Sequence, residues 1–225
     1  MKKAYIKSIS YYLPDKVVTN EELVADFPEW TVEKIADKVG VKERHVAVDS
    51  ETATDLAVKA AEKLFAENLE ITKDSIDFIV FCTQSPDYLL PTSACLIQER
   101  LGLRTDIGAF DFNLGCSGYV YGLSIAKGLI AGGIATNVLL LTGETYNKHL
   151  HPRDKGNRTI FGDAATGGLL FQLKVLQKLV NLPSEQMAVE LRILSSRLVD
   201  HAIQKKREIL VLTIMEIPVR LTTSL

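Results

Sequence analysis

One cysteine stands where a protein can use it as a nucleophile. Cys116 lies between Gly115 and Ser117, after an apolar run that ends at Phe112 and before a stretch of helical composition. This pattern predicts a strand, a tight turn and a helix, with Cys116 at or just before the first helical turn. Free amide groups and the positive end of a helix dipole favour an anion there. We therefore expect an activated thiolate that attacks carbonyl carbon.

The neighbours of Cys116 suit the same chemistry. Gly115 and Gly118 leave room for a substrate carbonyl, and amides of the following helix are placed to donate to a developing oxyanion. The other two cysteines, Cys82 in an apolar strand and Cys95 on a predicted helix, are interpreted as buried structural residues. A buried structural role is also the alternative for Cys116.

The single tryptophan is a candidate ligand contact. Trp30 begins a predicted helix that also carries Lys34 and Lys38, so a partly exposed ring could stack on a nucleotide whose phosphates attract the lysines. The alternative is that Trp30 anchors a hydrophobic core. His149 and His151 are bases by type, and a solvated loop is the favoured interpretation for both. No His, Cys or carboxylate spacing is typical of a metal site, so no metal is expected.

Periodicity predicts the elements that position these residues. Continuous apolar runs and β-branched residues predict strands over 3–13, 76–82, 107–112 and 137–142. Helical spacing predicts helices from 20, over 30–38, from 54 to about 69, over 92–101 and over 117–131. Thr54 is the expected cap of the third helix. Strands that alternate with helices indicate a layered α/β fold with a sheet covered on both faces.

Composition excludes several classes of protein. The chain has 225 residues, 47% of them hydrophobic, and a formal net charge of −2. A chain so nearly neutral has no overall field to attract nucleic acid or an anionic membrane. Its apolar runs fall short of the roughly 20 residues of a membrane span, and lysines stand where an export signal needs an apolar stretch. Three cysteines without close pairing fit a reducing compartment. We expect a cytoplasmic protein.

The C-terminal part differs in kind. All 14 glycines lie at or before Gly168, and the Tyr, Phe and Trp residues all lie at or before Phe171. Residues 173–208 have helical composition. We therefore predict one structural unit over 1–170. Residues 171–225 are predicted to be a helical tail of a different kind of sequence. A frameshift or gene truncation is our hypothesis for the origin of the tail.

Several motifs together resemble the β-ketoacyl-acyl-carrier-protein synthase III family, condensing enzymes of the thiolase superfamily. The resemblance covers residues 1 to about 166. Its motifs occur in matching order: YLP at 12–14, EW at 29–30, GVKERH at 40–45, PTSAC at 91–95, DFNLGCSG at 111–118 and FGDAA at 161–165. The resemblance implies a thiolase-like fold, layered α-β-α-β-α in complete members. This chain would supply about one βαβαβαββ half and the unmatched tail.

The resemblance also implies an acyltransferase reaction. Cys116 would accept an acyl group from acyl-CoA, and malonyl-acyl carrier protein would then lose CO₂ and attack the thioester. Trp30 matches the residue that stacks on the adenine of CoA. Lys155 takes a second stacking position, usually an arginine, with Arg158 nearby, and Lys38 is a further expected contact. The CoA thioester is a substrate, and no cofactor is expected to be bound permanently.

Further expectations concern the acyl pocket and the partners. Leu90 and Phe112 are the expected pocket residues, and Leu90 would reach across a homodimer into the acyl pocket of the partner. The carrier protein is the other expected partner. The family's catalytic His and Asn belong to motifs resembling HQAN and GNT/S, which do not occur in these 225 residues; His201 lies in VDHA.

Two alternatives remain open from the sequence. In the first, the chain is not a catalyst: it is an inactive fragment, or a regulatory half that pairs with a complete synthase near Leu90. In the second, the chain is a related acyltransferase of polysaccharide or secondary-metabolite synthesis. In complete members the helix after Cys116 lies between two sheets. We therefore expect that helix to expose one face here and the chain to be poorly soluble.

Overall fold

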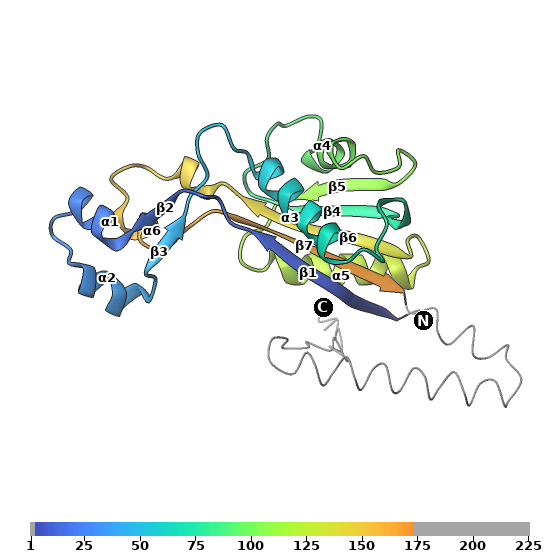
Figure 1. Cartoon of the computed structure of the whole chain (residues 1–225), viewed down its shortest axis with the longest axis horizontal. Helices are drawn as coiled ribbons and strands as arrows, with labels where there is room; N and C mark the ends of the chain where they lie inside the picture. Colours follow the sequence, from blue (N-terminus) through green and yellow to red (C-terminus); the bar gives the residue numbers. More distant parts are fainter. Residues whose placement is uncertain (1–2, 173–225) are drawn as a thin grey trace, which may run out of the picture. The chain divides into compact units, whose positions relative to one another are not determined.

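A five-stranded mixed sheet forms the centre of the structure, a computed structural model that describes residues 3–172 (Figure 1). The strands lie in the order β1-β7-β6-β4-β5. They are β1 (Ala4–Tyr12), β4 (Phe78–Cys82), β5 (Gly108–Phe112), β6 (Asn137–Glu144) and β7 (Ala164–Gln172). β4 pairs in parallel with β5 and β6, whereas β7 is antiparallel to β6 and β1. The predictions for residues 173–225 lie outside the described residues.

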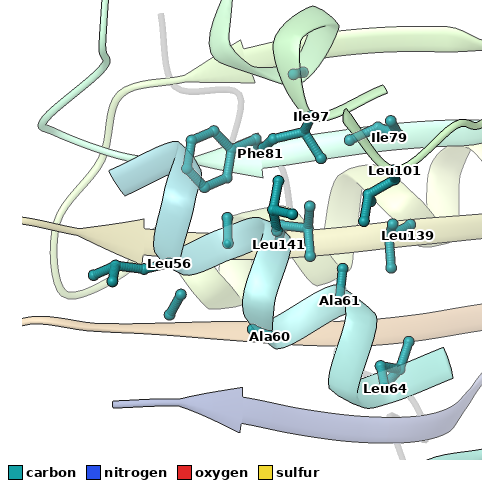
Figure 2. Close-up of a cluster of buried hydrophobic side chains, with 14 of the residues drawn as sticks. Leu56, Ala60, Ala61, Leu64, Ile79, Phe81, Ile97, Leu101, Leu139 and Leu141 are labelled. Atoms are coloured by element: carbon teal, nitrogen blue, oxygen red, sulfur yellow. The ribbon is translucent and has the colours of Figure 1, made fainter. Parts of the chain in front are cut away.

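Helices cover both faces of this sheet, as the continuous apolar strands predict. α3 (Ala53–Glu67) and α4 (Ser93–Arg100) pack on one face, and α5 (Gly118–Ala131) packs on the other. Figure 2 shows the larger core, a cluster that includes Leu56, Ala60 and Leu64 of α3 together with Leu139 and Leu141 of β6. The order β1-α3-β4-α4-β5-α5-β6-β7 is the expected βαβαβαββ pattern.

A small lobe is inserted between β1 and α3. Its elements are β2 (Val17–Thr19), α1 (Asn20–Asp26), α2 (Val32–Val39) and β3 (Glu43–His45), with β2 and β3 paired antiparallel. Leu23, Phe27 and Ile35 form its own core. The remaining short elements are η1 (Lys73–Ser75), η2 (Tyr146–His149) and α6 (Lys155–Arg158). Among residues 3–172, no helix is long and apolar enough to cross a bilayer.

The sequence analysis missed three strands. β2 and β3 have three residues each, too few to show a period. β7 contains Gly167 and Gly168, which are unfavourable in strands. Gly167 lies under α3: a Cβ there would be 3.4 Å from the Ala60 carbonyl oxygen. An added methyl group would also lie 3.3 Å from Leu141 Cδ2, so the space beneath α3 admits little more than a methyl group.

The cap of α3 is Thr52, so the prediction that Thr54 caps this helix is wrong. The Thr52 hydroxyl accepts from the Asp55 amide (3.2 Å), and the Asp55 carboxylate accepts from the Thr52 amide (2.7 Å). Thr52 Oγ1 also lies 2.8 Å from the Asp87 carboxylate. Thr54 is fully buried inside the helix, and its hydroxyl has no hydrogen-bond partner within residues 3–172.

The two threonines therefore respond oppositely to substitution. We expect Thr52→Ala to lower the free energy of unfolding by about 1 kcal/mol, the usual cost of a lost N-cap. Thr54→Val keeps the shape and removes an unpaired buried hydroxyl, so its effect is expected to be neutral or stabilising. Urea unfolding of both variants checks this. A Thr54→Val variant less stable than Thr52→Ala would contradict the assignment of the cap.

Candidate active site

Cys116 is exposed on the turn that joins β5 to α5. It lies two residues before Gly118, the first helical residue, and the Gly118 amide closes the turn on the Gly115 carbonyl at 2.8 Å. Ser117 is the N-cap, and its side chain makes no capping bond. The amides that follow Gly118 in the first turn of α5 therefore receive no bond from the Ser117 side chain, and a helix N-terminus of this kind can donate to an anion.

Cys82 packs against this turn, in contact with Leu114 and Gly118. It is buried at the end of β4, and its thiol donates to the Leu114 carbonyl at 3.2 Å. A Cβ at Gly118 would lie 2.3 Å from Cys82 Sγ, so only glycine fits at that position. Burial raises the pKa of the Cys82 thiol, and a nearby carboxylate, Glu144, raises it further. The predicted structural role of Cys82 is confirmed.

Glu144, at the end of β6, holds the loop beside this turn. Its carboxylate accepts from the Gln84 amide at 2.7 Å and from the Ser85 hydroxyl at 2.5 Å. The Gln84 side chain in turn lies against Gly115, where a Cβ would be 2.9 Å from Gln84 Oε1. Sequence analysis missed Glu144, although an acidic residue directly after a buried strand is a signal that can be recognised. This carboxylate thus indirectly positions the Cys116 turn.

Burial raises the pKa of the Glu144 carboxyl above its ordinary value, despite the bonds from Ser85 and Gln84. The folded protein therefore holds this proton more strongly than the unfolded chain. The stabilisation from this group is complete below the ordinary glutamate pKa, about 4.3, and is lost as pH rises through the raised folded value.

Glu144→Gln removes this pH dependence. Its amide keeps an oxygen for the Gln84 amide and removes the buried charge. We expect the stability of Glu144→Gln relative to the wild type to increase from pH 4 to pH 7, measured by urea unfolding at both pH values. A relative stability that decreases over this interval would show that the carboxylate is favoured in the fold.

Trp30 lies two residues before α2, half-buried against the core of the small lobe. Lys34 Nζ is 5.1 Å from the centroid of its ring, within reach of a cation–π contact. Lys155 on α6 bonds the carboxylate of Glu29, the residue before Trp30, at 2.8 Å. Lys38 is exposed in the last turn of α2. The ring is therefore both a lobe-packing residue and partly accessible.

Arg158 also reaches the lobe but contacts different residues. It lies 3.0 Å from the Asp26 carboxylate, and its guanidinium carbon is 5.3 Å from the centroid of the Phe27 ring. Its Nη1 donates to the Pro152 carbonyl at 2.7 Å. The structure thus brings both basic residues of α6 to the lobe, where Lys155 bonds Glu29 and Arg158 contacts Asp26 and Phe27.

The remaining candidates are placed as follows. Leu90 is 82% exposed in the loop between β4 and α4, and Phe112 is half-buried against the core on the α5 side. His149 and His151 are exposed, as expected for a solvated loop. Cys95 is exposed, so the prediction of a buried cysteine is wrong. Only the face of α4 opposite to it is buried, because that face packs on the sheet.

Comparisons with known proteins give the same picture. A family model for 3-oxoacyl-[acyl-carrier-protein (ACP)] synthase III matches residues 110–180. A β-ketoacyl-[acyl-carrier-protein] synthase III of Chlamydia caviae is 38% identical over 169 residues, covering 74% of this chain and 49% of the relative. That of Ehrlichia canis is 41% identical over 165 residues, with coverages of 73% and 51%. The chain therefore spans about half the length of the curated relatives it matches.

Solved structures agree. A crystal structure of a 3-oxoacyl-(acyl-carrier-protein) synthase III superposes with a TM-score of 0.74 at 54% identity, covering 75% of this chain and 50% of that one. The priming β-ketosynthase of the R1128 polyketide pathway superposes with a TM-score of 0.72 at 24% identity, which shows the fold alone. Residues 3–172 thus have a thiolase-like fold. More particularly, the chain is a partial match to the synthase III family, over about half of a member's length.

Proposed function

We propose that this chain provides the nucleophile-bearing half of a 3-oxoacyl-acyl-carrier-protein synthase III-type condensing enzyme of fatty-acid synthesis. The observation that carries the proposal is the position of Cys116. It is exposed on a strand-to-helix turn, before a helix start without a side-chain cap, in a segment that the family model matches. Acyl-CoA is the proposed acyl donor, and the enzyme class is acyltransferase.

The first proposed step is acyl transfer to Cys116. The thiolate attacks the thioester carbonyl of acyl-CoA, and we propose that amides of the first turn of α5 beyond Gly118 donate to the developing oxyanion. The C–S bond to CoA then breaks, and the CoA sulfur leaves as a thiolate that takes up a proton. Cys82 takes no part, because it is buried and bonded to Leu114.

The second proposed step is condensation. Malonyl-acyl carrier protein loses CO₂, the resulting carbanion attacks the acyl group on Cys116, and the cysteine leaves as a thiolate. The family motifs that carry His and Asn do not occur in these 225 residues. We therefore propose that this chain alone can form the acyl-enzyme. Condensation then needs a His and an Asn supplied by another polypeptide segment.

The proposed partners are acyl-CoA, an acyl carrier protein and a second subunit, in the cytoplasm. Tyr88, Leu89 and Leu90 form an exposed apolar loop, with Leu89 94% exposed. Such a loop favours a protein contact, and it is the surface we propose for a dimer or for pairing with a complete synthase. Co-purification with a complete synthase would support the regulatory alternative.

Mass spectrometry tests the proposed function. After incubation of the 225-residue chain with acetyl-CoA, we expect a gain of one acetyl group, located by peptide mapping on Cys116. Addition of malonyl-acyl carrier protein is expected to give no β-ketoacyl product. A chain that gains no acetyl group at any acetyl-CoA concentration would favour the inactive-fragment alternative, and a complete condensation product would contradict the proposed division of the reaction.

A further inference from the structure

Arg44 is a buried cation bonded only to uncharged groups among residues 3–172. The residue is on β3 and is 3% exposed. Its Nη1 donates to Asn20 Oδ1 at 2.5 Å, and its Nε donates to the Thr159 carbonyl at 2.8 Å. Nη2 donates to the same Thr159 carbonyl and, at 3.4 Å, to the Val41 carbonyl. A buried guanidinium without a carboxylate partner is costly, so its presence at this position calls for an explanation.

The bonds of Arg44 join parts of the chain that lie far apart in sequence. Asn20 begins α1 and Val41 precedes β3, both in the small lobe, whereas Thr159 directly follows α6. Asn20 is itself 3% exposed, and its side-chain NH₂ donates to the Val41 carbonyl at 3.0 Å. This bond orients the Asn20 amide so that its Oδ1 faces Arg44. The planar guanidinium thus links the lobe to the end of α6 through donors of fixed geometry.

The other links between α6 and the lobe are weaker. The Lys155–Glu29 pair has half-exposed side chains, and in the Arg158–Asp26 pair the aspartate is 54% exposed. Exposed ion pairs of this kind contribute little to holding two elements together. Arg158 also lies over the buried Phe27 ring, 5.3 Å from its centroid. Arg44 is therefore the residue that joins the Trp30 lobe to the end of α6 through buried hydrogen bonds.

We propose that Arg44 is a positioning residue for the nucleotide part of the acyl-CoA donor. By holding the end of α6 against the lobe, it keeps Lys155 at Glu29, the residue before Trp30, and we propose that one ligand contacts both Lys155 and Trp30. The inference rests on the proposed function, because it takes acyl-CoA as the donor. The inference adds Arg44, a residue that touches no substrate. Arg44 acts by fixing the position of α6 relative to the small lobe.

Arg44→Lys tests the inference, because it keeps the charge and loses the planar fork. The readout is the rate of acyl transfer to Cys116 from acetyl-CoA and from acetyl-pantetheine, which has the same thioester and lacks the nucleotide. We expect the preference for acetyl-CoA to fall by about tenfold, the effect of losing one charge-assisted network. The rate with acetyl-pantetheine is expected to stay unchanged.

A binding measurement gives the same test without chemistry. Trp30 is the only tryptophan of the chain, so its fluorescence reports CoA binding at this lobe alone. Arg104→Lys is the matched control, because Arg104 is 39% exposed and bonds Ile76 and Asp77, away from α6. We expect weaker CoA binding for Arg44→Lys and wild-type binding for Arg104→Lys. If Arg44→Lys does not fold, Asn20→Ser, which shortens one acceptor, is expected to lower the acetyl-CoA preference in the same direction.

The outcomes separate this inference from the proposed function. An Arg44→Lys variant with the wild-type preference for acetyl-CoA, or one that loses both rates equally, would overturn the inference alone. The second result would show a general structural role. A wild-type chain that accepts acetyl groups from neither donor would overturn the proposed function together with the inference.

Discussion

Replacement of Cys116 by serine is expected to remove acyl transfer from acetyl-CoA to the chain. A serine hydroxyl is not ionised at neutral pH, and without an adjacent general base it is a far weaker nucleophile than a thiolate. We expect the rate of acetylation to fall by roughly 100-fold or more. Intact-mass measurement over a time course checks this. The fold is expected to be unchanged, because residue 116 is exposed and the substitution exchanges one atom.

Cys95→Ser is the matched control for this result. Cys95 is also free and exposed, but it lies on α4, not before a helix start. Its Sγ is 3.4 Å from Thr92 Oγ1, and the first two amides of α4, those of Ser93 and Ala94, already donate to the Asp111 carboxylate. We expect Cys95→Ser to be acetylated at the wild-type rate. Acetylation that is lost in Cys95→Ser and retained in Cys116→Ser would refute the assignment of the nucleophile.

Gly118→Ala is expected to be the most destabilising of the substitutions considered, although alanine favours helices over glycine. The new Cβ would lie 2.3 Å from Cys82 Sγ, a distance that forces the turn or β4 to move. Overpacking of this kind typically costs about 1–3 kcal/mol in the free energy of unfolding. Because the turn carries Cys116, we also expect slower acetylation. Urea unfolding and the mass measurement give the two values.

Cys82→Ala in the Gly118→Ala background tests the cause. Removal of the sulfur leaves the next atoms at 3.4 Å (Leu114 Cβ) and 3.8 Å (the Cβ of residue 82), which are ordinary contacts. The double variant is therefore expected to be more stable than the sum of the single effects predicts, by about 1–2 kcal/mol. Cys82→Ala alone is the control, since it loses the bond to Leu114. Strictly additive effects would mean that Gly118 is required for another reason.

The exposed face of α5 agrees with the expectation drawn from its composition. Val120 and Tyr121 are each 57% exposed, whereas Gly122 packs against Leu140, where a Cβ would lie 2.6 Å from the leucine side chain. Gly128 faces open space among the described residues. The small residues of α5 therefore serve two faces, one packed on β6 and one open. Poor solubility of the chain stays a prediction.

Local patterns determined the elements on which the candidate site depends. Hydrophobic runs of strand length and stripes of helical period gave β4, β5, β6, α3 and α5 to within a few residues. The strand-turn-helix pattern from β5 through Gly115 and Gly118 to α5 likewise predicted that Cys116 lies on the turn before the helix. These signals are local, because the residues that specify a strand, a turn or a helix are neighbours in the sequence.

Contacts between residues distant in sequence were decided by the tertiary structure. Asp111 on β5 accepts from the amides of Ser93 (2.5 Å) and Ala94 (2.6 Å), and so caps α4 from another element. Arg44 with Thr159, and Glu144 with Gln84, are further examples. Buried polar groups must find partners wherever the fold brings them. No local period encodes that choice, so only the packed structure shows which side chains hold the Cys116 turn and the Trp30 lobe in place.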